Sequence, residues 1–542
     1  MRRREPHPML PALLVTALLT ACASAPVPSP TPAPVVDVPA ISRPEGETAA
    51  WWFRDGAAQA ASRGAMDGRA RNVILFVGDG MSLPTVAAAR ILAGQQAGAP
   101  GEAHRLSWEH FPATALSRTY NTDAQTPDSA GTMTAMSTGV KTRAGHIAVG
   151  PSAPSGDCAA GRDAMLLTLW ELAETQGLST GVVSTTRVTH ATPAATFTHG
   201  ADRGWEGDTD LSGDARRAGC IDYARQWVES TLAPDVLLGG GRAFFMPGTQ
   251  ADPEYPDQAG GRGDGRDLVA AWQRRHPGGT YAWNAAQLAA APLDGPLLGL
   301  FERWDMHYEH DRPGDAAGEP SLADMTQAAI ARLERDQDGY LLLVEGGRID
   351  HAGHDGNAYR ALTETIAMAD AVQVAVDMTS ADDTLVIVTA DHSHTLGFVG
   401  YPVRGNPILG LVRGDDGELS TDTNGLPYTT LAYANGPGYT GPGRPDLSAV
   451  DTTDPDYRQE AMVPLGAETH GGDDVGVWAR GPGSAAVRGS IEQNALFHLM
   501  LQATPRLRDG LCDAGLCNAD GVPVELPRRE DFVPAPVVPT AG

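Results

Sequence analysis

Five short runs of Val, Ile and Leu constrain the fold more than any other feature of this sequence. Each run is bounded by Gly or by polar residues, and the five cover residues 72–78, 180–186, 235–239, 340–345 and 384–390. Continuous apolar runs of this length are typical of strands that are buried on both faces of a mainly parallel sheet. Residues 322–335 and 359–378 instead carry apolar side chains at helical spacing. The sequence therefore predicts an α/β fold with a central, mainly parallel sheet flanked by helices.

Acidic residues and histidines follow three of these runs. They are Asp79 after the first run, Glu345, Asp350 and His351 at the end of the fourth, and Asp391 and His392 after the fifth. The carboxyl ends of parallel strands share one edge of a sheet, where α/β proteins bind ligands. A single Asp after a strand is usually a helix cap. Three clusters at one edge would repel one another unless cations lay nearby, so the sequence predicts metal ions there.

The residue types indicate which ion the first cluster prefers. Asp350 and His354 are four residues apart, so on a helical turn both lie on one face and could bind one ion. A third ligand such as His470 would complete an oxygen and nitrogen set that suits zinc with an open position.

A second and a third ion are predicted from the remaining ligands. Asp79, Asp391 and His392 would form a second zinc site. An oxygen set made of Asp79, Glu345 and a hydroxyl would instead prefer magnesium. Two zinc ions about 4 Å apart can stabilise both the attacking and the leaving oxygen of a phosphoryl displacement.

Ser129 is the candidate nucleophile. Residues 126–132 indicate a loop that leads into a helix, with Ser129 in its first turn. The free amides and the dipole at a helix start favour anions, whether a phosphate or an alkoxide. A Pro-Asp-Ser segment alone is most often only an N-cap, and the metal clusters are what favour the functional interpretation.

The start of the chain is typical of an export signal. A basic segment is followed by an apolar run over residues 9–21, which is too short to span a bilayer and fits a signal peptide. The run ends in Leu-Thr-Ala-Cys, which resembles a bacterial lipobox in which Cys22 would be lipidated. Ordinary cleavage near Ala23 or Ala25 is the alternative. We expect an exported protein that Cys22 anchors to a membrane of the bacterial cell envelope, facing the periplasm or the cell surface.

Charge and cysteine content narrow the function classes further. The chain has 67 Asp and Glu against 40 Lys and Arg, a formal charge of −27, which argues against a nucleic-acid partner. Export implies an oxidising compartment, where the four cysteines after Cys22 can pair in three ways. Cys512 and Cys517 suit a local bridge, and Cys158 and Cys220 would then close a longer loop. Metal binding by these thiols is the alternative, but no CxxC spacing supports it.

Several motifs together resemble the alkaline phosphatase family, and most closely its animal-type members. The motifs cover residues 78–81, 126–130, 137–142, 185–194, 298–302, 345–351, 389–392 and 469–472. Their order and spacing match across about residues 72–517. The resemblance implies a phosphatase domain at residues 51–520, after a signal peptide at 1–21 and a lipidated, Pro-rich linker at 22–50. A Pro-rich tail would follow at 521–542.

The resemblance also implies a role for each site residue. Ser129 corresponds to the nucleophile that becomes a phosphoserine, Arg203 to the arginine that holds two phosphate oxygens, and Asp128 to the residue that orients it. The implied metal ligands are Asp350, His354 and His470 for the first zinc, Asp79, Asp391 and His392 for the second, and Asp79, Thr192 and Glu345 for magnesium. His190 and His351 stand where the best-known enterobacterial member has Asp and Lys, which places His190 beside the magnesium.

Three further features are implied only by the resemblance to the animal-type enzymes. A calcium site would use Glu254, Glu302, the backbone carbonyl of Phe301, and Glu319 in place of the family's Asp; surface acids without an ion are the alternative. The pairs Cys158/Cys220 and Cys512/Cys517 match that group's disulfides. Residues 410–464 would form an inserted lobe, which lies at a dimer interface in relatives, so the resemblance leaves a homodimer open.

The function implied is the hydrolysis of phosphate monoesters, which releases inorganic phosphate and an alcohol. A sulfatase of the same superfamily would need Pro and Arg where this chain has Gly131 and Met133. A phosphodiesterase remains open, although Arg203 favours a dianionic terminal phosphate. A lipoprotein that only binds phosphate would be favoured by the loss of a zinc ligand, and each expected ligand is present.

Overall fold

The computed structural model describes Val38, Ser42 and residues 46–534. The predicted signal peptide, Cys22 and most of the linker lie outside these described residues, as does the end of the predicted tail. The chain divides into two units, residues 1–37 and residues 38–542, and the fold reported below is that of the second. Within the described ranges, no helix combines the length and the apolar character needed to cross a bilayer.

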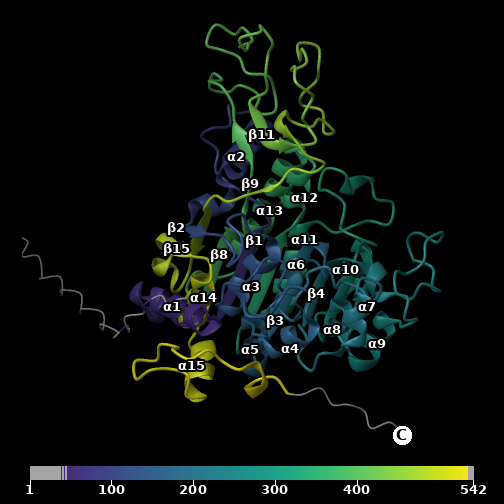
Figure 1. Cartoon of the computed structure of the whole chain (residues 1–542), viewed down its shortest axis with the longest axis vertical. Coiled ribbons are helices and arrows are strands. Elements are labelled where there is room, and N and C mark those ends of the chain that lie inside the picture. The colour runs from purple at the N-terminus through teal and green to yellow at the C-terminus, as the bar shows by residue number, and fades with distance from the viewer. Residues whose placement is uncertain (1–37, 39–41, 43–45, 535–542) are drawn as a thin grey trace, which may run out of the picture. The chain divides into compact units, whose positions relative to one another are not determined.

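A ten-stranded sheet forms the centre of the second unit (Figure 1), in the order β15-β2-β14-β8-β1-β7-β3-β4-β6-β5. The strands are β1 (Asn72–Gly78), β2 (Ala113–Arg118), β3 (Ser179–Arg187), β4 (Val236–Gly240), β5 (Thr280–Ala282), β6 (Leu297–Leu300), β7 (Tyr340–Gly346), β8 (Thr384–Ala390), β14 (Val475–Arg480) and β15 (Arg488–Glu492). The five predicted runs are β1, β3, β4, β7 and β8, which are neighbours in the sheet and all parallel. β14 is antiparallel to both of its neighbours, β8 and β2. The predicted α/β fold with a mainly parallel sheet is confirmed.

Helices cover both faces of the sheet, and each face has its own core. The side chains of β1 alternate between the two cores, with Val73, Leu75 and Val77 in one and Ile74 and Phe76 in the other. The first core includes side chains of α1 (Ala49–Ser62), α3 (Ser129–Thr138), α5 (Leu169–Thr175), α14 (Ala495–Ala503) and α15 (Pro505–Asp513). The second includes side chains of α2 (Leu83–Gln96), α11 (Leu322–Leu333) and α13 (Ala358–Met378). The two helices predicted from apolar spacing are α11 and α13.

Shorter elements complete the unit. They are α4 (Cys158–Asp163), α6 (Ala191–Ala194), α7 (Gly213–Arg217), α8 (Tyr223–Glu229), α9 (Leu268–Arg275), α10 (Ala285–Ala290), α12 (Arg348–His354), and the paired strands β9 (Ser393–His394) and β13 (His470–Gly471). A separate three-stranded sheet contains β10 (Leu396–Phe398), β11 (Leu431–Gly436) and β12 (Ala461–Pro464). It lies at the base of the green loops at the top of Figure 1, which include the predicted insertion at 410–464.

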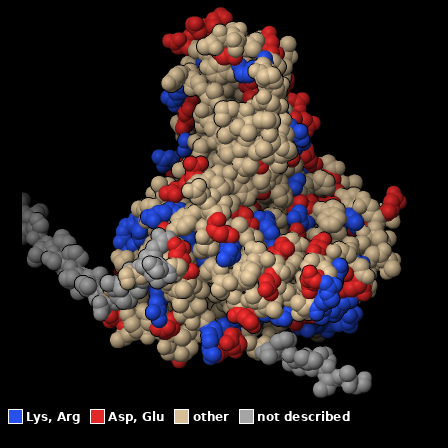
Figure 2. All heavy atoms as spheres, viewed as in Figure 1, with Lys and Arg blue, Asp and Glu red and all other residues tan. Residues whose placement is uncertain are grey.

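Figure 2 shows acidic and basic side chains interspersed over one face of the unit. The domain boundaries themselves stay predictions.

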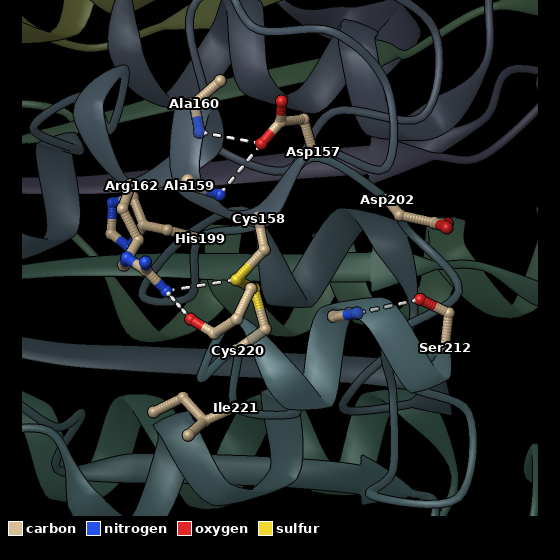
Figure 3. Close-up of a disulfide and its surroundings, with 12 residues drawn as sticks. Asp157, Cys158, Ala159, Ala160, Arg162, His199, Asp202, Ser212, Cys220 and Ile221 are labelled. Atoms are coloured by element: carbon tan, nitrogen blue, oxygen red, sulfur yellow. Dashed lines mark hydrogen bonds between the residues drawn. A yellow bond between two sulfur atoms is a disulfide. The ribbon is translucent and has the colours of Figure 1, made fainter.

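Both cysteine pairs expected from the sequence form disulfides. Cys158 and Cys220 are joined across 62 residues of chain, with their Cα atoms 5.9 Å apart, and Cys512 is joined to Cys517. The longer bridge ties the start of α4 to the segment after α7 (Figure 3). Asp157 caps α4 by accepting from the amides of Ala159 and Ala160 beside the bridge. The alternative of a thiol metal site is thereby excluded for these four residues.

The single lysine of the chain is a buried structural cation. The side chain of Lys141 is 1% exposed, and its Nζ donates to the carbonyl oxygens of Arg118 and Tyr120 and lies 2.9 Å from Glu492 Oε2. Nζ also lies 3.4 Å from the ring centroid of Tyr120. Burial lowers the pKa of Lys141 to about 8, although the charge of Glu492 opposes this shift. Lys141 thus ties the segment after α3 to β2 and to the edge strand β15.

We expect the Lys141→Met substitution to lower the free energy of unfolding by about 3 kcal/mol, because it removes one partner of a buried ion pair. The urea midpoint of unfolding, followed by circular dichroism, would measure the change. The matched control is Arg118→Met, because Arg118 contacts the same Glu492 but its side chain is 47% exposed. An exposed pair contributes about 1 kcal/mol or less. Equal losses for the two variants would contradict the structural role of Lys141.

Candidate active site

The site lies at the carboxyl ends of the central strands β8, β1, β7 and β3. Gly78 at the end of β1 is in register with Gly346 of β7 and with Ala390 of β8, so these three strands end at the same level. The acidic and histidine clusters that follow them are therefore neighbours in space. The structure brings together all the residues predicted as zinc and magnesium ligands, in groups of three or four that could hold an ion.

The first group contains Asp350, His354 and His470, and α12 presents the first two on one face. His470 Nε2 lies 3.3 Å from Asp350 Oδ1, and His354 Nε2 lies 3.4 Å from Asp350 Oδ2. The Nδ1 atoms of His354 and His470 face the carbonyl oxygens of Glu468 and Pro127 at 2.6 and 2.8 Å. Each Nδ1 therefore carries the proton, and the two Nε2 lone pairs face each other at 3.1 Å. Two such nitrogen lone pairs repel each other unless a cation lies between them. This set of one carboxylate and two imidazole ligands therefore fits zinc.

His394 joins this group, although it was not among the predicted ligands. Its Nε2 lies 2.7 Å from Asp350 Oδ1, and its Nδ1 is hydrogen-bonded to Glu468. Burial lowers the pKa of His394, but the contacts with Asp350 and Glu468 outweigh burial and raise it to about 10. Because both ring nitrogens are occupied, His394 orients Asp350 as an outer partner of the metal group. The pairing of β9 with β13 sets His394 opposite His470.

The second group contains Asp79, Asp391 and His392, all fully buried. His392 Nε2 lies 3.3 Å from Asp79 Oδ1 and 3.2 Å from Asp391 Oδ2. Burial raises the pKa of Asp79 well above its ordinary value, and the nearby charges of Asp391, Asp350 and Glu345 add to this effect. Burial likewise lowers the pKa of His392 well below its ordinary value. The group therefore holds excess negative charge and a neutral imidazole, which fits a bound cation.

The third group contains Asp79, His190 and Glu345, beside Thr192. Within the described residues, Asp79 Oδ2, His190 Nδ1 and Glu345 Oε1 are buried and have no hydrogen-bond partner. Burial raises the pKa of Glu345 to about 7, although a hydrogen bond from Ser184 opposes the shift. Buried polar atoms are rarely left without a partner. These atoms fit the predicted magnesium ion, with one histidine nitrogen added to the oxygens.

Ser129 and Arg203 lie beside these groups. Ser129 begins α3, and its Oγ lies 3.4 Å from Asp79 Oδ1 and 3.2 Å from His392 Nε2. Asp128 caps the helix and also accepts a 3.0 Å hydrogen bond from Arg203 Nη1. Arg203 Nη2 lies 3.0 Å from His190 Nε2, and its side chain is 31% exposed. The guanidinium is thus held at the open side of the site, where an anion can reach it.

His351 lies outside the three groups. Its ring centroid is 5.5 Å from that of His190, and its Nδ1 lies 2.8 Å from Arg348 Nη1. Arg348 lies 3.8 Å from Asp305, which also pairs with Arg187. His351 therefore links the site to a network of charged residues behind it.

The residues predicted to bind calcium are only partly gathered. Glu302 and Glu319 lie together with His307, which the sequence reasoning missed. Phe301 directly follows β6, and its amide donates to Gly239. Glu254 Oε2 is 2.8 Å from Arg242 Nη2, so one of its oxygens is already paired.

Known proteins resemble this chain over most of its length. A family model described as alkaline phosphatase matches residues 70–505. The tissue-nonspecific isozyme of alkaline phosphatase from Gallus gallus is 45% identical over 444 residues, covering 80% of this chain and 84% of that protein. The alkaline phosphatase of Gadus morhua is 44% identical over 445 residues, covering 80% of this chain and 92% of that protein.

Solved structures share the fold. The crystal structure of Thermus thermophilus alkaline phosphatase matches with a TM-score of 0.58 at 25% identity, covering 81% of this chain and 92% of that chain. The alkaline phosphatase from the Antarctic bacterium TAB5 matches with a TM-score of 0.55 at 22% identity, covering 81% of this chain and 98% of that chain.

We expect His394→Gln to weaken zinc binding by roughly 10–100-fold, the usual cost of losing an outer partner of a metal ligand. The substitution removes the link between Asp350 and Glu468 while leaving the three predicted ligands in place. Competition with a chromogenic chelator would measure the affinity. His104→Gln is the control, because His104 is exposed. Unchanged zinc affinity in His394→Gln would show that His394 does not support the group.

Proposed function

The chain belongs to the alkaline phosphatase family and hydrolyses phosphate monoesters, and we propose that it does so through a covalent phosphoserine at Ser129. The observation that carries the proposal is the position of Ser129 Oγ, within 3.5 Å of both Asp79 and His392 and at the start of α3. Free amides at a helix start favour the alkoxide form of a hydroxyl, and a metal cation held by the neighbouring ligands would favour it further.

The reaction proceeds by two in-line displacements at phosphorus. In the first, Ser129 Oγ attacks phosphorus, the bond from phosphorus to the alcohol oxygen breaks, and the alcohol leaves with a proton. In the second, water attacks the phosphoserine, the bond from phosphorus to Ser129 Oγ breaks, one proton of the water passes to Ser129 Oγ, and inorganic phosphate leaves with the other. Arg203, held by Asp128, binds two non-bridging oxygens with its planar fork during both steps. Because these contacts are to the phosphoryl group, the leaving alcohol is weakly specified.

Two zinc ions and one magnesium ion are the proposed cofactors. The first zinc would be held by Asp350, His354 and His470. The second zinc would be held by Asp79, Asp391 and His392. The magnesium would be held by Asp79, Thr192 and Glu345, with His190 beside it. When bound, such ions supply Lewis-acid stabilisation for the attacking and leaving oxygens. The facing Nε2 atoms of His354 and His470 and the unpaired oxygens of Asp79 and Glu345 support this assignment.

A fourth ion is proposed at Glu302 and Glu319. Calcium, the ion that the sequence predicts, takes six to eight oxygen ligands. Glu254 Oε2 accepts a hydrogen bond from Arg242, and His307 brings a nitrogen atom into the group. Calcium therefore fits these residues only in part.

Location and assembly are also proposals. The two disulfides support an oxidising compartment and hence export. Lipid anchoring through Cys22, which lies outside the described residues, rests on the resemblance of residues 19–22 to a lipobox. A homodimer through the lobe at 410–464 rests on the family resemblance.

We expect Ser129→Ala to lower the hydrolysis of an aryl phosphate by at least roughly 1,000-fold, as loss of a catalytic nucleophile does elsewhere. Wild-type protein quenched in acid with labelled phosphate should retain label on Ser129, and the variant should not. Ser137→Ala is the matched control, because Ser137 is a buried serine of the same helix. Activity of Ser129→Ala within tenfold of the wild type would refute the role.

Arg203→Ala should separate monoesters from diesters. A hydrogen bond to a charged group contributes about 1.5–3 kcal/mol. We therefore expect kcat/KM for a phosphate monoester to fall roughly 10–150-fold. The fall for a diester should be smaller, because a diester offers fewer charged terminal oxygens. Arg216→Ala, at an exposed position, is the control. Equal losses on both substrates would indicate that Arg203 does not select the monoester dianion.

A further inference from the structure

Arg203, the arginine proposed to bind phosphate, is carried by a short segment at residues 200–206. These seven residues are all described, and they belong to none of the helices and strands named above. The segment begins at Gly200, which exchanges two backbone hydrogen bonds of 2.9 Å with Ile147. Because no regular element fixes the rest of the segment, the backbone of Arg203 depends on contacts with other parts of the chain.

Tyr223 provides such contacts on both sides of Arg203. Its hydroxyl donates a 2.6 Å hydrogen bond to the carbonyl oxygen of Asp202, and its backbone amide donates to the carbonyl oxygen of Trp205 at 2.9 Å. The side chain of Tyr223 is fully buried. Burial raises the pKa of Tyr223 well above its ordinary value, so its hydroxyl remains a hydrogen-bond donor in alkaline solution. The peptide group that joins Asp202 to Arg203 is therefore held in one orientation.

Tyr223 is itself fixed by a disulfide and by a buried ion pair. It is the first residue of α8 and follows Cys220, which is bonded to Cys158 (Figure 3), by three positions. Asp222 caps the same helix and accepts hydrogen bonds of 2.8 and 3.1 Å from the buried guanidinium of Arg262. The start of α8 is thus a rigid support, and Tyr223 extends from it to the segment that carries Arg203.

The backbone at Gly200 leaves space for the hydroxyl of Tyr223. A Cβ atom on Gly200 would lie 2.3 Å from Tyr223 Oη and 2.9 Å from its Cε1. Both distances are shorter than the contacts that real Cβ atoms make. Gly200 is not among the glycines with a positive φ, so the tyrosine, and not the backbone conformation, requires glycine at this position. The tyrosine ring and the start of the segment are therefore closely packed.

We propose that Tyr223 is a positioning residue for Arg203, whose guanidinium it aligns with the phosphoryl group through the hydrogen bond to Asp202. The inference rests on the proposed role of Arg203 in binding phosphate. A bidentate contact needs both guanidinium nitrogens within hydrogen-bond reach of two phosphate oxygens, and small displacements of a positioned group weaken such a contact. Tyr223 belongs to none of the three metal groups, so its effect on phosphate passes through residues 200–206.

The test removes only the hydroxyl, by Tyr223→Phe in the full-length, metal-loaded protein. We expect the inhibition constant of inorganic phosphate to rise roughly 3–10-fold, which corresponds to the loss of about one hydrogen bond. The value of kcat/KM should fall by a similar factor for a phosphate monoester and by less for a diester, as expected for Arg203→Ala. The zinc and magnesium content should stay the same.

Tyr340→Phe is the matched control. Tyr340 is also buried, and its hydroxyl has no hydrogen-bond partner within the described residues. It should therefore leave phosphate inhibition and the ratio of monoester to diester hydrolysis at the wild-type values. An equal change in the two tyrosine variants would overturn the proposal, because the effect would then not depend on the contact with Asp202.

Combining Tyr223→Phe with Arg203→Ala decides whether the tyrosine acts through the arginine. We expect the effect of Tyr223→Phe on phosphate inhibition to disappear in the Arg203→Ala background, since two residues that act as one unit are not additive. An equal effect in both backgrounds would overturn the proposal. Unchanged inhibition in Arg203→Ala would refute the proposed role of Arg203 and this inference with it. A change in Arg203→Ala but not in Tyr223→Phe would refute this inference alone.

Gly200→Ala serves as a second variant if circular dichroism shows that Tyr223→Phe folds poorly. Its added methyl group would displace the hydroxyl of Tyr223 from Asp202 without removing it. Phosphate inhibition should weaken in the same direction as expected for Tyr223→Phe. Inhibition at the wild-type level in a folded Gly200→Ala protein would count against the proposal.

Discussion

Buried negative charge at one edge of the sheet is the constraint on which the rest of the structure depends. Asp79, Glu345, Asp350 and Asp391 are each at most 4% exposed, and they lie at or after the carboxyl ends of three adjacent parallel strands. Removing such carboxylates from water costs several kcal/mol each unless cations or hydrogen bonds compensate. Burial and mutual repulsion raise the pKa of Asp79 and Asp391 in the metal-free protein. Cations bound at these strand ends would therefore stabilise this edge of the sheet.

The surrounding residues serve two purposes at once. Asp128 caps α3, which presents Ser129, and the same carboxylate holds Arg203. His394 crosses from Asp350 to Glu468 and fixes the orientation of a predicted zinc ligand. Because of these double contacts, the proposed nucleophile, the arginine proposed to bind phosphate and the candidate metal ligands are held by the same side chains. Substitutions of Asp128 or His394 should therefore alter metal affinity and catalysis together, without unfolding the sheet.

The loop from residue 302 to residue 319 extends this arrangement away from the strand ends. Asp305 within it pairs with Arg187, whose side chain also binds Glu206. Because Arg187 is the last residue of β3, these ion pairs tie the loop to the central sheet.

Local patterns in the sequence determined the five central strands, two long helices and the start of α3 at Ser129. These features depend on apolar spacing, caps and strand ends, which act over a few residues and can be read from the chain. His394 and Glu468 are 74 residues apart, and they meet through two-residue strands that carry no periodic signal. Arg242 reaches Glu254, and His307 reaches Glu319, only because loops fold back on the sheet. Tertiary structure alone decided these contacts, because the partner of a buried charge is set by the path of the loops and not by its neighbours in sequence.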